Sequence, residues 1–245
     1  MSANEATLAK IRAILAKAED PAATPEEAET YFAKAAALMS KYGVERAMLA
    51  EADPSTDKPS TRTIMLKGSY LLDRVQLLNN VTTALGGQTV RWRVYDWESG
   101  KHAQNVEVHA FESTLDRIEL LFTSLLLQAF NGMKQGTPAW GESTTAYRKS
   151  WLAGFSQSVY HRLARSEEIA AAQATPELGG RSAELVLSSR EDTIRAQFKA
   201  AHPKVRMAAK RRLTGSGWSE GKAAGQRADL GDSRVTSGRR RAVSA

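Results

Sequence analysis

The sequence predicts an α-rich α+β protein with an N-terminal helical hairpin, a mixed domain that combines a small sheet with long helices, and a basic C-terminal extension. Three observations predict this class. Apolar residues recur at spacings of three and four along most of the chain, which is typical of amphipathic helices. Two runs near the middle alternate polar and apolar residues, which is typical of strands. The positive charge is concentrated near the C-terminal end.

The N-terminal segment 1–52 predicts two helices that pack against each other. Asp20-Pro21 separates them, and 24–27 begins the second helix with a capping Thr, a Pro at the first helical position and a Glu that completes the capping box. We expect Gly43 to end this helix in a left-handed turn and 44–52 to add a short helix. Each long helix has its own apolar stripe: Leu8, Ile11, Leu15 and Ala18 in the first, and Ala28, Phe32, Ala35, Met39 and Tyr42 in the second.

Segment 53–60 has the composition of a linker, with Pro54 and Pro59 among small polar residues. We therefore expect a boundary between a helical hairpin module at 1–52 and a mixed α+β core domain at 61–203. Beyond 203 the apolar periodicity is poor, so 204–245 is predicted to be a basic extension rich in Gly, Ala and Arg.

The core domain is predicted to begin with a strand at 63–67 and a helix at 71–85 that Gly86-Gly87 ends. A β-hairpin follows, with its turn near Ser99-Gly100. Because side chains alternate between the faces of a strand, we expect one buried face and one open face. The buried face would hold Val90, Trp92, Val94, Val106, Val108 and Ala110, and the open face Arg91, Arg93, Tyr95, Glu107, His109 and Phe111.

The second half of the core domain is predicted to be mostly helical. A helix at 112–130, capped by Ser113, is apolar on nearly every side, so we expect it to lie at the centre of the core. A long helix at 143–171 follows, with an apolar stripe of Tyr147, Trp151, Phe155, Val159 and Leu163. After it we expect a short strand at 185–187 and a helix at 191–201.

Two parts of the chain resemble a known family. The hairpin sequence KIRAILAKAEDPAATPEEAETYFAKAAALMSKYGV closely resembles the module called domain of unknown function 2786. FESTLDRIELLFTSLLLQAF, YRKSWLAGF and AAGQRADLG resemble the C-terminal region that accompanies it in bacterial and bacteriophage proteins. The resemblance implies an α-rich organisation and brings no activity, substrate or catalytic residue.

Few residues have the spacing of a catalytic or cofactor site. His109 and Glu112 form an H-x-x-E pair that His161 or Glu107 could join in a hydrolase-like enzyme, but no second His completes the H-E-x-x-H pattern of hydrolytic zinc sites. Segment 215–225 lacks the leading strand and the Ser or Thr of a phosphate-binding loop. We therefore expect no metal and no cofactor.

The predicted open face of the hairpin has the residue types of an RNA-binding strand surface. Arg91, Arg93 and Tyr95 could contact phosphates and stack on bases. Packing of the sheet and charge pairing with Glu107 across the strands explain the same residues without a ligand, and we favour that interpretation.

The charge distribution points to an anionic partner. Segment 199–245 has 12 Lys and Arg against 3 Asp and Glu, whereas the whole chain has 34 against 27. Separated charge of this kind steers association with polyanions. We therefore expect phosphate-directed binding of DNA or RNA through Lys210, Arg211, Arg212, Lys222, Arg227, Arg234, Arg239, Arg240 and Arg241.

The function that the sequence favours is therefore a non-enzymatic nucleic-acid-associated or adaptor protein, whose N-terminal hairpin contacts a protein partner. A hydrolase-like enzyme with a site near His109 and Glu112, or a structural component of an assembly, are the alternatives. The chain has no cysteine, no run long enough to span a membrane and no signal-peptide pattern. These absences favour a cytoplasmic protein with no membrane partner.

Overall fold

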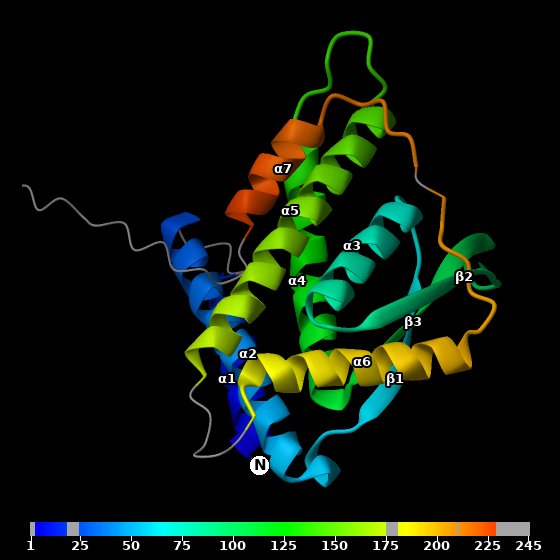
Figure 1. The fold of residues 1–245 in the computed structure, drawn as a ribbon. Helices are drawn as coiled ribbons and strands as arrows, with labels where there is room; N and C mark the ends of the chain where they lie inside the picture. Colours follow the sequence, from blue (N-terminus) through cyan, green and yellow to red (C-terminus); the bar gives the residue numbers. More distant parts are fainter. Residues whose placement is uncertain (1–2, 19–24, 175–180, 210, 229–245) are drawn as a thin grey trace, which may run out of the picture.

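The computed structural model describes residues 3–18, 25–174, 181–209 and 211–228. Figure 1 shows an α-rich α+β fold in which long helices pack beside and across a small antiparallel sheet, and this confirms the predicted class. The elements are α1 Ala3–Ala18, α2 Pro25–Ala52, the 3-10 helix η1 Pro54–Thr56, β1 Pro59–Leu66, α3 Leu71–Ala84, β2 Gln88–Asp96, β3 Lys101–Phe111, α4 Glu112–Gln135, α5 Thr144–Gln173, α6 Ala183–Ala201 and α7 Trp218–Arg227.

The N-terminal hairpin forms as predicted, with α1 packed against α2 and both Ile11 and Met39 buried in the core. The prediction that Gly43 ends the second helix is wrong, because α2 continues through it to Ala52. Gly43 is instead important for packing, because it has no side chain. A Cβ at Gly43 would lie 2.0 Å from Nη1 of Arg117, so the guanidinium of α4 occupies the space that any other residue would fill. Asp20-Pro21 lies outside the described residues.

The predicted linker contains a buried anchor. The Asp57 side chain is fully buried, and its carboxylate accepts hydrogen bonds from the Ser113 backbone N–H at 3.1 Å and from the Ser113 hydroxyl at 2.6 Å. It also pairs with Arg190 of α6 at 2.5 Å. The start of α4 is therefore capped by a carboxylate from a distant part of the chain, and not by Ser113 as predicted. This anchor joins the segment after the hairpin to both α4 and α6.

The sheet has the strand order β1-β3-β2, with both pairs antiparallel. Its register places Arg91 opposite Val106, and His109 opposite both Thr61 and Gln88. Because directly opposite residues share a face, Arg91, Arg93 and Tyr95 lie on the face of Val106 and Val108. The prediction that they share a face with Glu107 and His109 is wrong, since a shift of one residue in register exchanges the two faces of a strand.

The two faces of the sheet are covered by different helices. On one face, Arg62 of β1 contacts Asp116 and Glu119 of α4 at 2.9 and 2.6 Å. On the other, His109 of β3 contacts Phe198 and the end of α6. Figure 1 shows α6 crossing the sheet at a large angle to α5. The sheet is thus the middle layer between α4 and α6.

Helix α6 also overturns one predicted element. The segment 185–187, which we expected to be a strand, lies in the first turns of this helix. Leu185 is 57% exposed while Val186 is buried, and the Ser182 hydroxyl accepts the N–H of Leu185 at 3.4 Å as an N-cap. A short apolar run does not by itself distinguish a strand from a helix. Here the N-cap at Ser182 marks the start of a helix.

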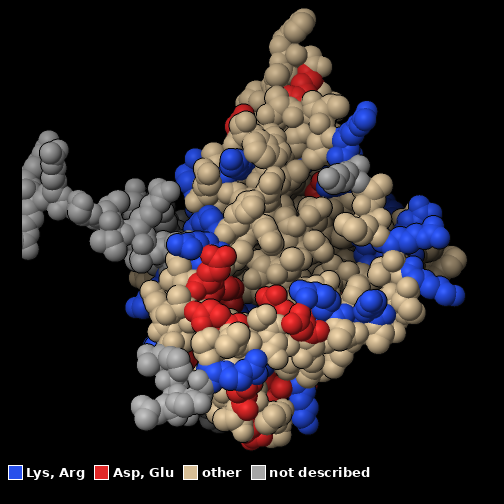
Figure 2. Space-filling model, viewed as in Figure 1, with Lys and Arg blue, Asp and Glu red and all other residues tan. Residues whose placement is uncertain are grey.

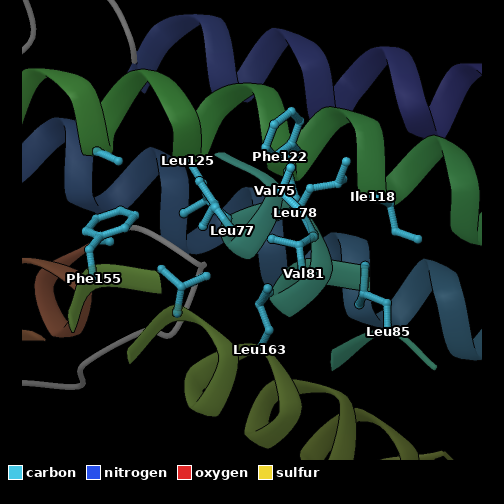
Figure 3. Close-up of a cluster of buried hydrophobic side chains, with 14 of the residues drawn as sticks. Val75, Leu77, Leu78, Val81, Leu85, Ile118, Phe122, Leu125, Phe155 and Leu163 are labelled. Atoms are coloured by element: carbon cyan, nitrogen blue, oxygen red, sulfur yellow. The ribbon is translucent and has the colours of Figure 1, made fainter. Parts of the chain in front are cut away.

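Helix α4 contributes to the core together with α3 and α5, although Leu127 on its outer side is 50% exposed. In Figure 3, Leu78 and Val81 of α3, Leu125 of α4 and Leu163 of α5 point toward one another, and all are at most 2% exposed. The predicted stripe of α5 is confirmed, because each of its members is buried: Tyr147, Trp151, Phe155, Val159 and Leu163.

Part of the predicted extension is a packed helix. Helix α7 lies along α5 in Figure 1, and its glycines bring the two backbones together. A Cβ at Gly221 would lie 1.9 Å from the Trp151 carbonyl oxygen, and one at Gly154 would lie 2.2 Å from the Trp218 carbonyl oxygen. The poor apolar periodicity of this region therefore hid a helix that packs through small residues.

A membrane-spanning helix is not among the elements. Across the ranges that the structure describes, every helix is too short or too polar to cross a bilayer.

Candidate functional site

Three potential metal ligands converge where β3 meets the end of α6. The Nε2 atom of His109 lies 2.7 Å from Oε1 of Glu107, and Nε2 of His202 lies 2.8 Å from the same oxygen. The two nitrogens are 3.1 Å apart. Among the described residues, these side chains form the one group of His, Cys, Asp or Glu that is compact enough to bind a metal ion. We call it the Glu107–His109–His202 cluster.

Strand geometry explains why the first two ligands meet. Glu107 and His109 are two residues apart on β3, so both point to the sheet face that α6 covers. The register places Thr61 of β1 directly opposite His109, and the Thr61 hydroxyl lies 3.2 Å from Nδ1 of that ring. The neighbouring strand therefore fixes the orientation of the imidazole.

The third ligand comes from the C-terminal end of α6. His202 is the C-cap residue, and its backbone N–H donates to the Phe198 carbonyl at 2.9 Å. The Phe198 ring lies 5.2 Å from the His109 ring and 5.1 Å from the His202 ring, so it packs against both imidazoles. The His109 side chain is 9% exposed, whereas Glu107 and His202 are each 23% exposed. The cluster is accordingly fixed on its inner side and open to solvent on the other.

The predicted enzymatic site is only partly assembled. His109 does meet Glu107, but Glu112 is exposed at the first turn of α4 and is not part of the cluster. His161 is exposed on α5, where its ring contacts Tyr160. His202 was missed because it lies 93 residues from His109 in the sequence. Only the alternation of Glu107 and His109 on one strand could have indicated half of the site.

The same region of the molecule is strongly basic. Segment 193–219 contains seven Lys and Arg and no Asp or Glu. Lys199, Lys204, Arg206 and Arg212 are exposed, and none of them forms an ion pair with a carboxylate of the described residues. Figure 2 shows Lys and Arg on the side of the molecule where α6 ends, whereas Asp and Glu gather over α5 and the first half of α6. We call these four residues the α6-end basic patch.

The structure separates the basic residues that the sequence grouped together. Arg211 is tied to the buried Asp73 of α3 at 2.8 Å, and Arg212 is exposed beside it. Lys222 lies over the Trp218 ring on α7, and Arg227 is in the last turn of that helix. The remaining predicted residues lie outside the described residues: Lys210, Arg234, Arg239, Arg240 and Arg241.

A second polar cluster has a structural explanation. Arg117 of α4 pairs with Glu167 of α5, and Ser40 of α2 donates to the same Glu167 at 2.8 Å. Arg117 and Glu167, together with Arg190 and Glu191, border a cavity of about 60 Å³. That volume holds no more than a few water molecules, so we assign the cluster to the packing of the helices.

Comparison with known proteins identifies only the N-terminal module. No curated protein and no solved structure matches the chain. Residues 6–46, which comprise nearly all of α1 and most of α2, match the family described as protein of unknown function (DUF2786), so the N-terminal helical hairpin of this chain carries that domain of unknown function.

Proposed function

We propose that the protein binds nucleic acid through phosphate-directed contacts made by the α6-end basic patch. The observation that carries this proposal is that the four cations form no ion pair with a carboxylate of the described residues. Lys199, Lys204, Arg206 and Arg212 are exposed without an ion-pair partner in the described part of the chain, so their charge is available to an anionic ligand.

The arrangement favours contacts with the backbone of a nucleic acid rather than with its bases. The patch consists of long flexible cations on one helix end and on the segment that follows, and such side chains contact phosphates more readily than base edges. Binding is therefore expected to tolerate many sequences and to fall steeply with salt, since each phosphate contact releases counterions. DNA and RNA are both suitable ligands on this argument.

The experiment compares two variants with the same change in net charge. In the first, Lys199, Lys204, Arg206 and Arg212 are replaced by Ala. In the control, four exposed cations from other parts of the chain are replaced instead: Lys10, Lys58, Lys134 and Lys149. We expect the first variant to reduce the slope of log affinity against log salt by up to about 3.6 on duplex DNA, at about 0.9 per contact, and the control to leave it almost unchanged.

Two outcomes would refute the proposal. Equal weakening in both variants would show that only the net charge matters. Absence of wild-type binding at about 50 mM salt, where phosphate contacts are strong, would show that the patch is merely a solvated surface.

A further inference from the structure

We propose that the Glu107–His109–His202 cluster binds one divalent transition-metal ion, with zinc as the reference case. This inference is independent of nucleic-acid binding, and it replaces the expectation from the sequence that the protein holds no metal. Two imidazole nitrogens and one carboxylate oxygen are a donor set that suits zinc and its neighbours in the first transition row.

The separations between the ligand atoms fit a shared ion. Two donors bound at about 2.05 Å lie about 2.9 Å apart in octahedral coordination and about 3.3 Å apart in the tetrahedral coordination usual for zinc. The three observed separations are 2.7, 2.8 and 3.1 Å. The three atoms therefore match one face of an octahedral coordination sphere, and they need to separate by only a few tenths of an ångström to bind a tetrahedral zinc ion.

The triangle can direct three lone pairs to one point. The ionised carboxylate of Glu107 only accepts hydrogen bonds, and a neutral imidazole has one unprotonated ring nitrogen. When that nitrogen is Nε2 in both histidines, whose Nε2 atoms are 3.1 Å apart, one cation just outside the plane of the three atoms accepts a lone pair from each.

The surroundings have the features of a supported metal site. Thr61 lies at hydrogen-bond distance from Nδ1 of His109, and such a contact to the second nitrogen commonly orients a ligating imidazole. Phe198 packs against both rings from the protein side. The partial exposure of Glu107 and His202 leaves the outer coordination positions open to water or a small ligand. Three protein ligands with an open position are characteristic of catalytic rather than purely structural zinc sites.

The test uses the full chain after treatment with a chelator. Co²⁺ is titrated while its visible absorption is recorded, and Zn²⁺ binding is measured by calorimetry. We expect one equivalent of metal in wild type. Loss of a residue that only orients a metal ligand typically costs about 10- to 100-fold in metal affinity. Loss of a ligand itself, in His202→Ala or Glu107→Gln, should therefore cost at least about 100-fold. The controls are His102→Ala and His161→Ala, which change the other two of the four histidines and should leave affinity unchanged.

A measurement on the unaltered chain guards against variants that fail to fold. In the NMR spectrum of wild type, Zn²⁺ should shift the imidazole signals of His109 and His202 and leave those of His102 and His161 in place. Equal shifts of all four, binding that survives both ligand variants, or no binding at about 1 mM metal would each overturn the proposal. None of these outcomes bears on the DNA-binding assay, so either proposal can be refuted without refuting the other.

Discussion

Gly221 of α7 lies directly against the backbone of Trp151 in α5, so closely that a Cβ at this glycine would be 1.9 Å from the Trp151 carbonyl oxygen. The obstacle is backbone rather than a flexible side chain, so it cannot move aside without displacing one of the helices. Gly217 and Gly225, four residues to either side, also meet α5 at short distances. The glycines of this segment are therefore packing residues that hold α7 in place.

We expect Gly221→Ala to destabilise the protein by about 2 kcal/mol, since overpacking of this kind typically costs 1–3 kcal/mol and outweighs the gain in helix propensity. Urea unfolding gives the change in free energy, and hydrogen exchange of the α7 amides shows whether this helix alone detaches. Ser219→Ala is the control, because Ser219 is exposed on the same helix. Unchanged stability in Gly221→Ala would mean that α7 does not pack on α5 as described.

A second contact between these helices predicts a dependence on alkaline pH. The Tyr147 hydroxyl donates to Oε2 of Glu220 at 2.6 Å. Burial, and then this hydrogen bond to a carboxylate, raise the pKa of Tyr147 from 10.0 to about 12. Because the folded state holds the proton more tightly than the unfolded state, the stabilisation is complete below about pH 10 and is lost as the pH rises toward 12.

Tyr147→Phe should therefore lose about 1.5–3 kcal/mol at pH 7, the usual contribution of a hydrogen bond to a charged group. The difference in unfolding free energy between wild type and variant should shrink between pH 10 and 12. Lysines titrate in the same range, so the difference between the two proteins is the quantity to measure. A difference that stays constant would contradict the raised pKa.

Substitution of the buried Asp57 should cause a large loss of stability, although the sequence predicted its segment to be a linker. Asp57→Asn leaves Arg190 without its charge partner, and breaking a buried pair in this way typically costs about 3–5 kcal/mol. Asp192→Asn is the matched control on α6, because its pair with Arg195 has side chains 68% and 61% exposed, and exposed pairs contribute about 1 kcal/mol or less. Thermal unfolding of the two variants should separate them clearly. Similar melting temperatures would show that the anchor contributes little.

The C-terminal arginines give a prediction that rests on the sequence. Replacing Arg239, Arg240 and Arg241 with Ala should flatten the salt slope of DNA binding by up to about 2.7, at about 0.9 per contact, and should leave the unfolding free energy unchanged because they lie outside any apolar periodicity. Filter binding between about 50 and 200 mM salt measures the slope. If the slope stays at its wild-type value while the α6-end variant lowers it, binding depends on the patch alone.

Local periodicity was sufficient to predict most of the helices. The stripes of α2 and α5 place Met39 and Phe155 in the core, and both are buried. The sheet faces were assigned wrongly because alternation fixes which residues of one strand share a face, but not which residue of the next strand lies opposite. Arg91 lies opposite Val106 only because of a register that the four-residue turn after Asp96 sets.

The candidate site could not be predicted in full because its parts are distant in sequence. Glu107 and His109 share a strand, but His202 joins them only after α6 has crossed the sheet. Helix α7 was missed for a different reason. Its packing face consists of glycines spaced four apart, and a search for apolar stripes interprets such residues as a loop.

The ion pair between Arg211 and Asp73 has a consequence for the entropy of any encounter with a polyanion. The segment after His202 is held at its start by α6, in its middle by this buried carboxylate, and at its end by α7. The conformational entropy of this segment is therefore lost when the protein folds. Binding of a phosphate by Lys204 and Arg206 would then cost little further backbone entropy. A detached tail of the same composition would have to be ordered by its ligand and would bind more weakly for each charge that it carries.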